Sequence, residues 1–271
     1  MSIEQEKKRA NNLCDNNQIL DEEGHTALHY ATSNNIYPLV ELLIRKGTQN
    51  NGDFFGVTPL HIACIEGYID IVKLFLKYGY NVNVTNVWNQ TPLIEACFHC
   101  KIDIVKCLIL HGAYLNKQSI NGMTALHYSC HNDYHSDCAH ILIENEADIN
   151  IQDYNRKTIL HQACLFGNEN IVKLLLSKKK LDLDIQDNNL KTALHYACFY
   201  KNVPLIKLLM NGNARCDIID SDNKKAIDYC KTEELRDLLK YYFPLPRLWT
   251  KNLLYLQLQH VFVDLKIKFS N

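Results

Sequence analysis

Apolar residues recur along this chain at helical spacing, in short segments that are each closed by glycine or a polar run. In IDIVKLFLKYG, from Ile69 to Gly79, apolar positions lie three and four residues apart, as on one face of an α-helix. The segment before it, TPLHIACIEG, begins with Thr58, a helix-capping residue, and has a proline at the first helical position. The two segments therefore predict a pair of helices, followed by the polar loop NVNVTN.

This pair of segments returns every 32 to 34 residues. Its first segment reads TALHYA, TPLHIA, TPLIEA, TALHYS, TILHQA and TALHYA, beginning at Thr26, Thr58, Thr91, Thr124, Thr158 and Thr192. A degenerate copy, KAIDYC, begins at Lys225. Period and phrase resemble the ankyrin repeat, from about Asp21 to Tyr242. The resemblance implies an all-α repeat solenoid of helix–turn–helix units with hairpin loops, in which neighbouring repeats bury each other's apolar faces and the function is protein binding.

The repeat divides the chain into three expected parts. Residues 1–20 are a polar N-terminal capping segment, and residues 21–243 are the ankyrin-repeat domain. Its repeats lie near 21–52, 53–85, 86–118, 119–152, 153–186, 187–219 and 220–243, the last one acting as a cap. Residues 244–271 are an apolar tail outside the repeat.

The tail has its own pattern. Pro244 and Pro246 stop helix continuation, and the alternation from Val261 to Phe269 is typical of a strand. Three roles remain open: a lid folded back on the array, a docking element for a second partner, or an end with no role of its own. FPLPRLW resembles the end of the SOCS box, which recruits ubiquitin ligases in some ankyrin proteins, but the first half of that box is absent.

The resemblance implies a binding surface like a cupped hand, with the hairpin tips as fingers and the inner helices as palm. The tips of four consecutive central repeats carry apolar or aromatic residues: Phe54, Phe55, Val87, Trp88, Ile120 and Tyr154. The palm positions are Ile65, Phe98, His99, Leu165, Phe166, Phe199 and Tyr200. A contiguous exposed row of this kind indicates an interaction site, suited to a helix or an extended peptide with apolar anchors. Packing of some rings on neighbouring repeats or on the tail remains the alternative.

Charge and cysteine content limit the classes of partner and the cellular compartment that we expect. The formal net charge of −1 favours neither nucleic acid nor an anionic membrane as partner. The N-terminal residues lack a signal-peptide core and no run of 18 apolar residues occurs, so we expect a cytoplasmic or nuclear protein. Five of the eleven cysteines share one position in the phrase, where we expect small buried residues in a reducing compartment: Cys64, Cys97, Cys130, Cys164 and Cys198.

Two sets of residues are of the types found in metal or catalytic sites. Their positions in the repeat indicate structural roles for both. The recurrent histidines at 29, 61, 127, 161 and 195 cannot converge on one ion, and in the ankyrin family they tie adjacent repeats together. Cys130, His131, His135, Cys138 and His140 have the residue types of a zinc site, but the repeat assigns Cys130 and Cys138 to the core. Catalytic motifs are lacking. We therefore expect no enzyme activity, no metal and no cofactor.

Three functional hypotheses follow. The first is a non-catalytic adaptor or scaffold that binds a partner protein through its concave face and hairpin tips. The second is a regulatory, inhibitory or chaperone-like subunit of one enzyme or complex, and a ubiquitin-ligase substrate adaptor acting through the tail is a variant of these. The third, a metal-dependent enzyme, requires stoichiometric zinc.

Overall fold

The computed structural model describes residues 21–130 and 136–230, and within these ranges it is an all-α repeat solenoid, as predicted. The inner helices are α2 (Ala27–Ser33), α4 (Pro59–Glu66), α6 (Pro92–Phe98), α8 (Ala125–Tyr128), α10 (Ile159–Phe166), α12 (Ala193–Phe199) and the 3-10 helix η2 (Ala226–Tyr229). The outer helices are α3 (Tyr37–Arg45), α5 (Ile69–Lys77), α7 (Ile102–Leu110), α9 (Ser136–Glu144), α11 (Glu169–Leu176) and α13 (Val203–Asn211). An isolated antiparallel bridge joins Ile219 and Lys225. The N-terminal capping segment, residues 231–243 of the seventh repeat and the tail at 244–271 lie outside the described residues.

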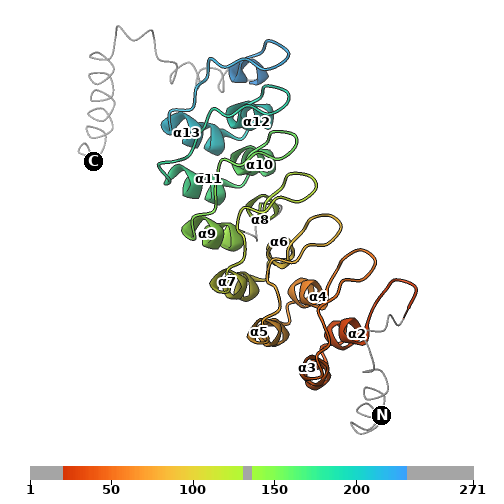
Figure 1. The fold of residues 1–271 in the computed structure, drawn as a ribbon. Helices are drawn as coiled ribbons and strands as arrows, with labels where there is room; N and C mark the ends of the chain where they lie inside the picture. The colour runs from red at the N-terminus through yellow and green to blue at the C-terminus, as the bar shows by residue number, and fades with distance from the viewer. Residues whose placement is uncertain (1–20, 131–135, 231–271) are drawn as a thin grey trace, which may run out of the picture.

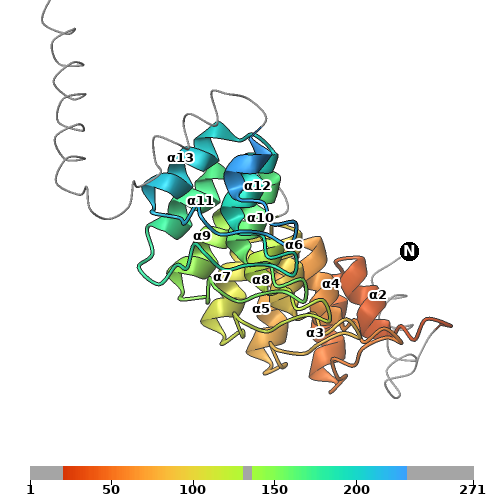
Figure 2. The same ribbon diagram turned by 90° about the horizontal axis from the view of Figure 1, so that it is seen from above.

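The inner and outer helices stand in two parallel columns, and the hairpin loops project from the inner column (Figure 1). Seen from above, the columns keep the same order from α2 and α3 to α12 and α13 (Figure 2). Each inner helix packs on the inner helices before and after it, which makes the core one continuous stack. None of the helices in the described part of the chain is long and apolar enough to cross a membrane.

The ends of the helices follow from local sequence. Gly67 and Gly167 end α4 and α10 in the left-handed conformation that favours glycine. Asn168 and Asn202 cap the outer helices α11 and α13, each accepting a hydrogen bond from a backbone N–H three residues later.

The cysteine positions are buried, as predicted. Cys64, Cys97, Cys130, Cys164 and Cys198 have no exposed surface, and no disulfide joins the ten cysteines of the described residues. Burial raises the pKa of the Cys64, Cys97 and Cys164 thiols, which keeps them protonated and unreactive.

The recurrent histidines connect repeats, again as predicted. Each ring uses Nδ1 to accept from the backbone N–H of the threonine that opens its own phrase. Nε2 donates to a backbone carbonyl of the following repeat at 2.9–3.3 Å. The carbonyls belong to Val57, Gln90, Lys157, Lys191 and Lys224. Ile94 holds this position in the third repeat, so the junction to the fourth repeat lacks the bond.

Phe75 offers a direct test of this core. It is fully buried in α5, with its ring edge-on to Tyr80 at 5.2 Å between centroids. We expect Phe75→Ala to lower the free energy of unfolding by about 3–5 kcal/mol, because it leaves a cavity between repeats. Leu110→Ala is the control: Leu110 is 83% exposed on α7, and its loss should change stability by less than about 0.5 kcal/mol. Urea unfolding followed by circular dichroism compares the two, and equal effects would contradict this description of the core.

Candidate partner-binding surface

A carboxylate or amide side chain at the base holds each hairpin tip except the fourth, where Ser119 Oγ accepts a single long hydrogen bond from the backbone N–H of Asn121 at 3.4 Å. Asp53 Oδ1 accepts from the backbone N–H of Phe55 at 2.8 Å and of Val57 at 2.9 Å. Asp153, Asp187 and Asp220 hold later tips with the same two bonds, and Asn86 does so with its amide oxygen. A buried acceptor that takes two amide protons fixes the turn. The tips are therefore rigid before any partner binds.

Backbone hydrogen bonds also join each tip to the next. The N–H of Phe54 donates to the carbonyl of Glu23, that of Val87 to Phe55, and that of Ile120 to Trp88, at 2.8–3.0 Å. The pattern continues to the end of the array through Tyr154, Asn188 and Ser221. The approach is close: a Cβ atom at Gly122 would lie 2.6 Å from the Tyr154 backbone nitrogen. The tips thus form one continuous row.

The apolar tip residues lie exposed along this row. We call Phe54, Phe55, Val87, Trp88, Ile120 and Tyr154 the tip row; all six side chains are between 43% and 69% exposed. The rings of Phe55 and Trp88 stack across neighbouring repeats, with centroids 5.8 Å apart and planes 8° from parallel. This stacked pair is an exposed aromatic platform whose geometry is already set.

The palm positions are less uniform. Phe98, Phe166, Phe199 and Tyr200 are 41–55% exposed and His99 is exposed, whereas Ile65 and Leu165 are half-buried. We call the tip row together with these seven palm residues the inner face.

At the C-terminal end of the inner face, aromatic rings contact other rings and lysine side chains. The Phe199 ring contacts Tyr200 and Tyr229 edge-on, and the ammonium group of Lys191 lies 6.0 Å from its centroid. Lys157 lies 5.0 Å above the ring of Tyr196 in the same manner. At this end of the array Phe199 and Tyr200 pack in part on neighbouring rings, which was the alternative to partner binding, although both side chains are still about half exposed.

One buried residue next to the inner face was not singled out from the sequence: Glu95, on α6. Its side chain is only 8% exposed, and its oxygens lie 3.5 Å from Asn86 Nδ2 and 3.9 Å from His99 Nε2. Both distances are too long for strong hydrogen bonds. Burial raises the pKa of Glu95 to about 7. The signal in the sequence was a carboxyl group at the fifth position of TPLIEA, where other repeats have Tyr, Ile or Gln.

This buried carboxyl predicts a pH-dependent effect of Glu95→Gln. A carboxyl group whose pKa is higher in the folded state destabilises that state increasingly as pH rises from the unfolded value to the folded one. We therefore expect Glu95→Gln to be more stable than the wild type, by about 2–3 kcal/mol more at pH 8 than at pH 5. Gln162 fills the equivalent position in the fifth repeat, so an amide fits there. Urea unfolding at both pH values measures the difference, and a pH-independent one would contradict the burial of a titrating carboxyl group.

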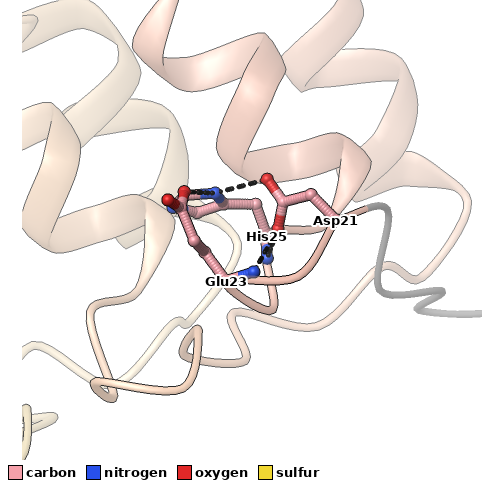
Figure 3. A group of neighbouring side chains, drawn as sticks. All are labelled: Asp21, Glu23 and His25. Atoms are coloured by element: carbon pink, nitrogen blue, oxygen red, sulfur yellow. Dashed lines mark hydrogen bonds and ion pairs between the residues drawn. The ribbon is translucent and has the colours of Figure 1, made fainter.

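Asp21, Glu23 and His25 form a cluster of potential metal ligands at the first tip (Figure 3). Asp21 accepts from the His25 ring at 2.8 Å, from Tyr30 Oη at 2.5 Å and from two backbone N–H groups. The Tyr30 hydroxyl is the main cause that holds the pKa of Asp21 well below its usual range. Asp21 thus holds the first tip as Asp53 holds the second.

Of the cysteines and histidines considered as zinc ligands, those that the structure describes do not lie together on one surface. Cys130 and Cys138 are fully buried and His140 is exposed, while His131 and His135 lie outside the described residues. Cys138 has a lowered pKa because it accepts from the thiols of Cys97 and Cys100, but burial separates it from solvent. The described members do not form a zinc site.

Comparison with known proteins is consistent with this geometry. A family model described as "Ankyrin repeats (3 copies)" matches residues 5–86, 78–153 and 152–222. Among curated proteins, ankyrin repeat protein OPG189 of Monkeypox virus is 38% identical over 68 residues, 25% of this chain and 12% of its own length. Human protein phosphatase 1 regulatory subunit 27 is 39% identical over 64 residues, 23% of this chain and 42% of its own. The chain thus spans less than half of each relative.

A solved structure matches over a longer range. The ankyrin repeat domain of Bcl-3, described as a member of the IkappaB protein family, superposes with a TM-score of 0.71 and 25% sequence identity. The match covers 81% of this chain and all of that one.

Proposed function

Because this chain belongs to the ankyrin-repeat family, we propose that it is a non-catalytic adaptor or scaffold that binds a segment of another protein along its inner face. The observation that carries the proposal is the tip row, an unbroken line of exposed apolar and aromatic side chains over four consecutive repeats. Surfaces of this kind mark interaction sites, and aromatic residues dominate the binding energy of such sites.

The rigidity of the tip row supports the proposal. The bonds at the base of each tip and between tips hold Phe55 and Trp88 in place without a partner. A surface that is ordered beforehand loses little conformational entropy on binding, which leaves more of the contact energy as affinity. The apolar character of these tips favours a partner segment with apolar anchors.

A regulatory or inhibitory role for the same surface is the second candidate. The local similarity to protein phosphatase 1 regulatory subunit 27 favours it, although it covers only 23% of this chain. A ubiquitin-ligase adaptor role and a second partner would act through residues 244–271, outside the described residues, and stay predictions. The expected cytoplasmic or nuclear location, and the expectation that neither nucleic acid nor membrane is a partner, also stay predictions.

A paired affinity capture from the native cell extract tests the adaptor proposal. One bait is the intact chain, a second carries Phe54→Asp, Phe55→Asp and Trp88→Asp, and a control carries Leu110→Asp on the outer helix α7. Circular dichroism first establishes that all three are equally folded. We expect one partner to be captured by the intact and control baits and lost from the triple variant. Identical captured sets from all three would contradict binding through the tip row.

A further inference from the structure

We propose that the partner segment places an arginine or lysine side chain against Glu95, where the hairpin of the third repeat meets its palm. The inference rests on the proposed function and specifies the partner's chemistry: one basic residue flanked by apolar anchors. The basic residue reaches the carboxylate while its neighbours lie on the tip row.

The position of Glu95 connects the two halves of the inner face. On the hairpin side it meets Asn86, whose Oδ1 also accepts from the backbone N–H of Trp88 at 3.0 Å. On the palm side it meets His99, whose ring packs edge-on against Phe98 with centroids 5.0 Å apart. The carboxyl group is therefore a buried polar point where the hairpin and the palm of the third repeat meet.

The third repeat differs from the others in where its carboxylate lies. In the first, sixth and seventh repeats the acid is in the hairpin, and a tyrosine at the position of Glu95 donates its hydroxyl to it. The pairs are Tyr30 with Asp21, Tyr196 with Asp187 and Tyr229 with Asp220. In the third repeat the acid is on the helix and faces the Asn86 amide at 3.5 Å. This carboxylate thus lacks the strong donor that its counterparts have.

No neighbouring basic side chain in the described residues donates a strong hydrogen bond to the Glu95 carboxylate. Of the basic groups in the described residues, His99 alone comes within 4.0 Å of the carboxylate, at 3.9 Å, and burial lowers the pKa of His99 so that its neutral form is favoured. Lys101 and Glu66 act on His99 with opposite signs. A buried carboxylate is costly unless it is paired and hydrogen-bonded, so it favours a partner that brings the missing cation.

A guanidinium or ammonium group fits this position. It would form a charge-assisted hydrogen bond with the carboxylate, in a site that excludes most water. The flat guanidinium group can also stack on an aromatic face, while its methylene stem covers apolar surface.

A display library of random 16-residue peptides, selected against three forms of the chain, tests the inference. The forms are the wild type, Glu95→Gln and, as the matched control, Glu66→Gln, which removes an exposed carboxylate from the preceding inner helix. We expect the wild type and the control to select peptides with one fixed arginine or lysine among apolar residues. A synthetic peptide from that selection should bind Glu95→Gln about tenfold or more weakly than the wild type. Its arginine-to-methionine version should bind both equally.

The outcomes separate this inference from the proposed function. If selected peptides have no fixed basic residue, or bind wild type and Glu95→Gln equally, the role of Glu95 is wrong; the adaptor proposal stands if Phe55→Asp with Trp88→Asp abolishes their binding. If no peptide is enriched, or if the enriched peptides ignore that double variant, peptide binding by the inner face is contradicted, and this inference with it.

Discussion

Alanine in place of both Phe55 and Trp88 is expected to weaken binding of the captured partner by about 100-fold or more. The two rings form the stacked pair at the centre of the tip row, each about half exposed, and aromatic residues in such positions supply most of the binding energy of an interface. Each single substitution should weaken binding by about 30-fold, so the double variant should lose less than the two single effects combined. Because the rings contact each other, the two effects should not add, and isothermal titration calorimetry of the four forms gives the coupling energy.

The control for this experiment lies on the opposite side of the array. Leu110→Ala removes a more exposed apolar side chain, on the outer helix α7, and is expected to leave affinity unchanged. A double variant that binds within about threefold of the wild type would exclude the stacked pair from the interface, whatever the singles show.

Acidification from pH 8 to pH 5 is expected to lower the free energy of unfolding of the Glu95→Gln variant by more than about 2 kcal/mol. The inter-repeat histidines are the cause. Their Nδ1 atoms accept from backbone N–H groups, so a proton on that nitrogen would break the arrangement. Burial lowers the pKa of all five and brings that of His61 to about 4.

The direction of this pH dependence follows from the number of protons that the folded and unfolded states bind. Between the unfolded pKa of about 6.5 and the lower folded values, the unfolded chain binds more protons than the folded one, so stability is full above that range and declines as pH falls through it. His61 alone accounts for the stated 2 kcal/mol, and the other four act in the same direction. The Glu95→Gln background is needed because Glu95 titrates with the opposite sign.

Urea unfolding at pH 8 and pH 5 measures this effect, and His61→Gln in the same background is the control. Its pH dependence should be shallower by about 2 kcal/mol, since one of the five titrating rings is removed. Equal pH dependence in both would contradict the role of His61 as a neutral bridge between repeats.

The sequence predicts most of the fold because each repeat is built the same way. The period places the helices, and the constant positions of His161 and Cys164 in the phrase identify an inter-repeat bond and a core residue. The bonds from tip to tip could not be predicted, because they join backbone groups and leave no trace in the side chains.

The candidate site was predicted less completely. Exposure of the tip row follows from its place in the turn, but the contacts of Phe199 and Tyr200 with neighbouring rings depend on side-chain directions that the period does not specify. Glu95 was missed because its importance depends on the Asn86 residue opposite to it. Only the packed structure reveals that this carboxyl group lacks a strong donor.

Photo-crosslinking shows directly whether the partner lies on the tip row. The photoreactive residue p-benzoylphenylalanine is placed at Tyr154, in the tip row, in one form of the chain and at Leu110, on the outer helix, in another; both positions are well exposed. The captured partner is irradiated with each form, and the products are separated by mass. We predict a covalent adduct from position 154 and none from position 110. An adduct from position 110 alone would place the partner on the outer helices and contradict binding through the tip row.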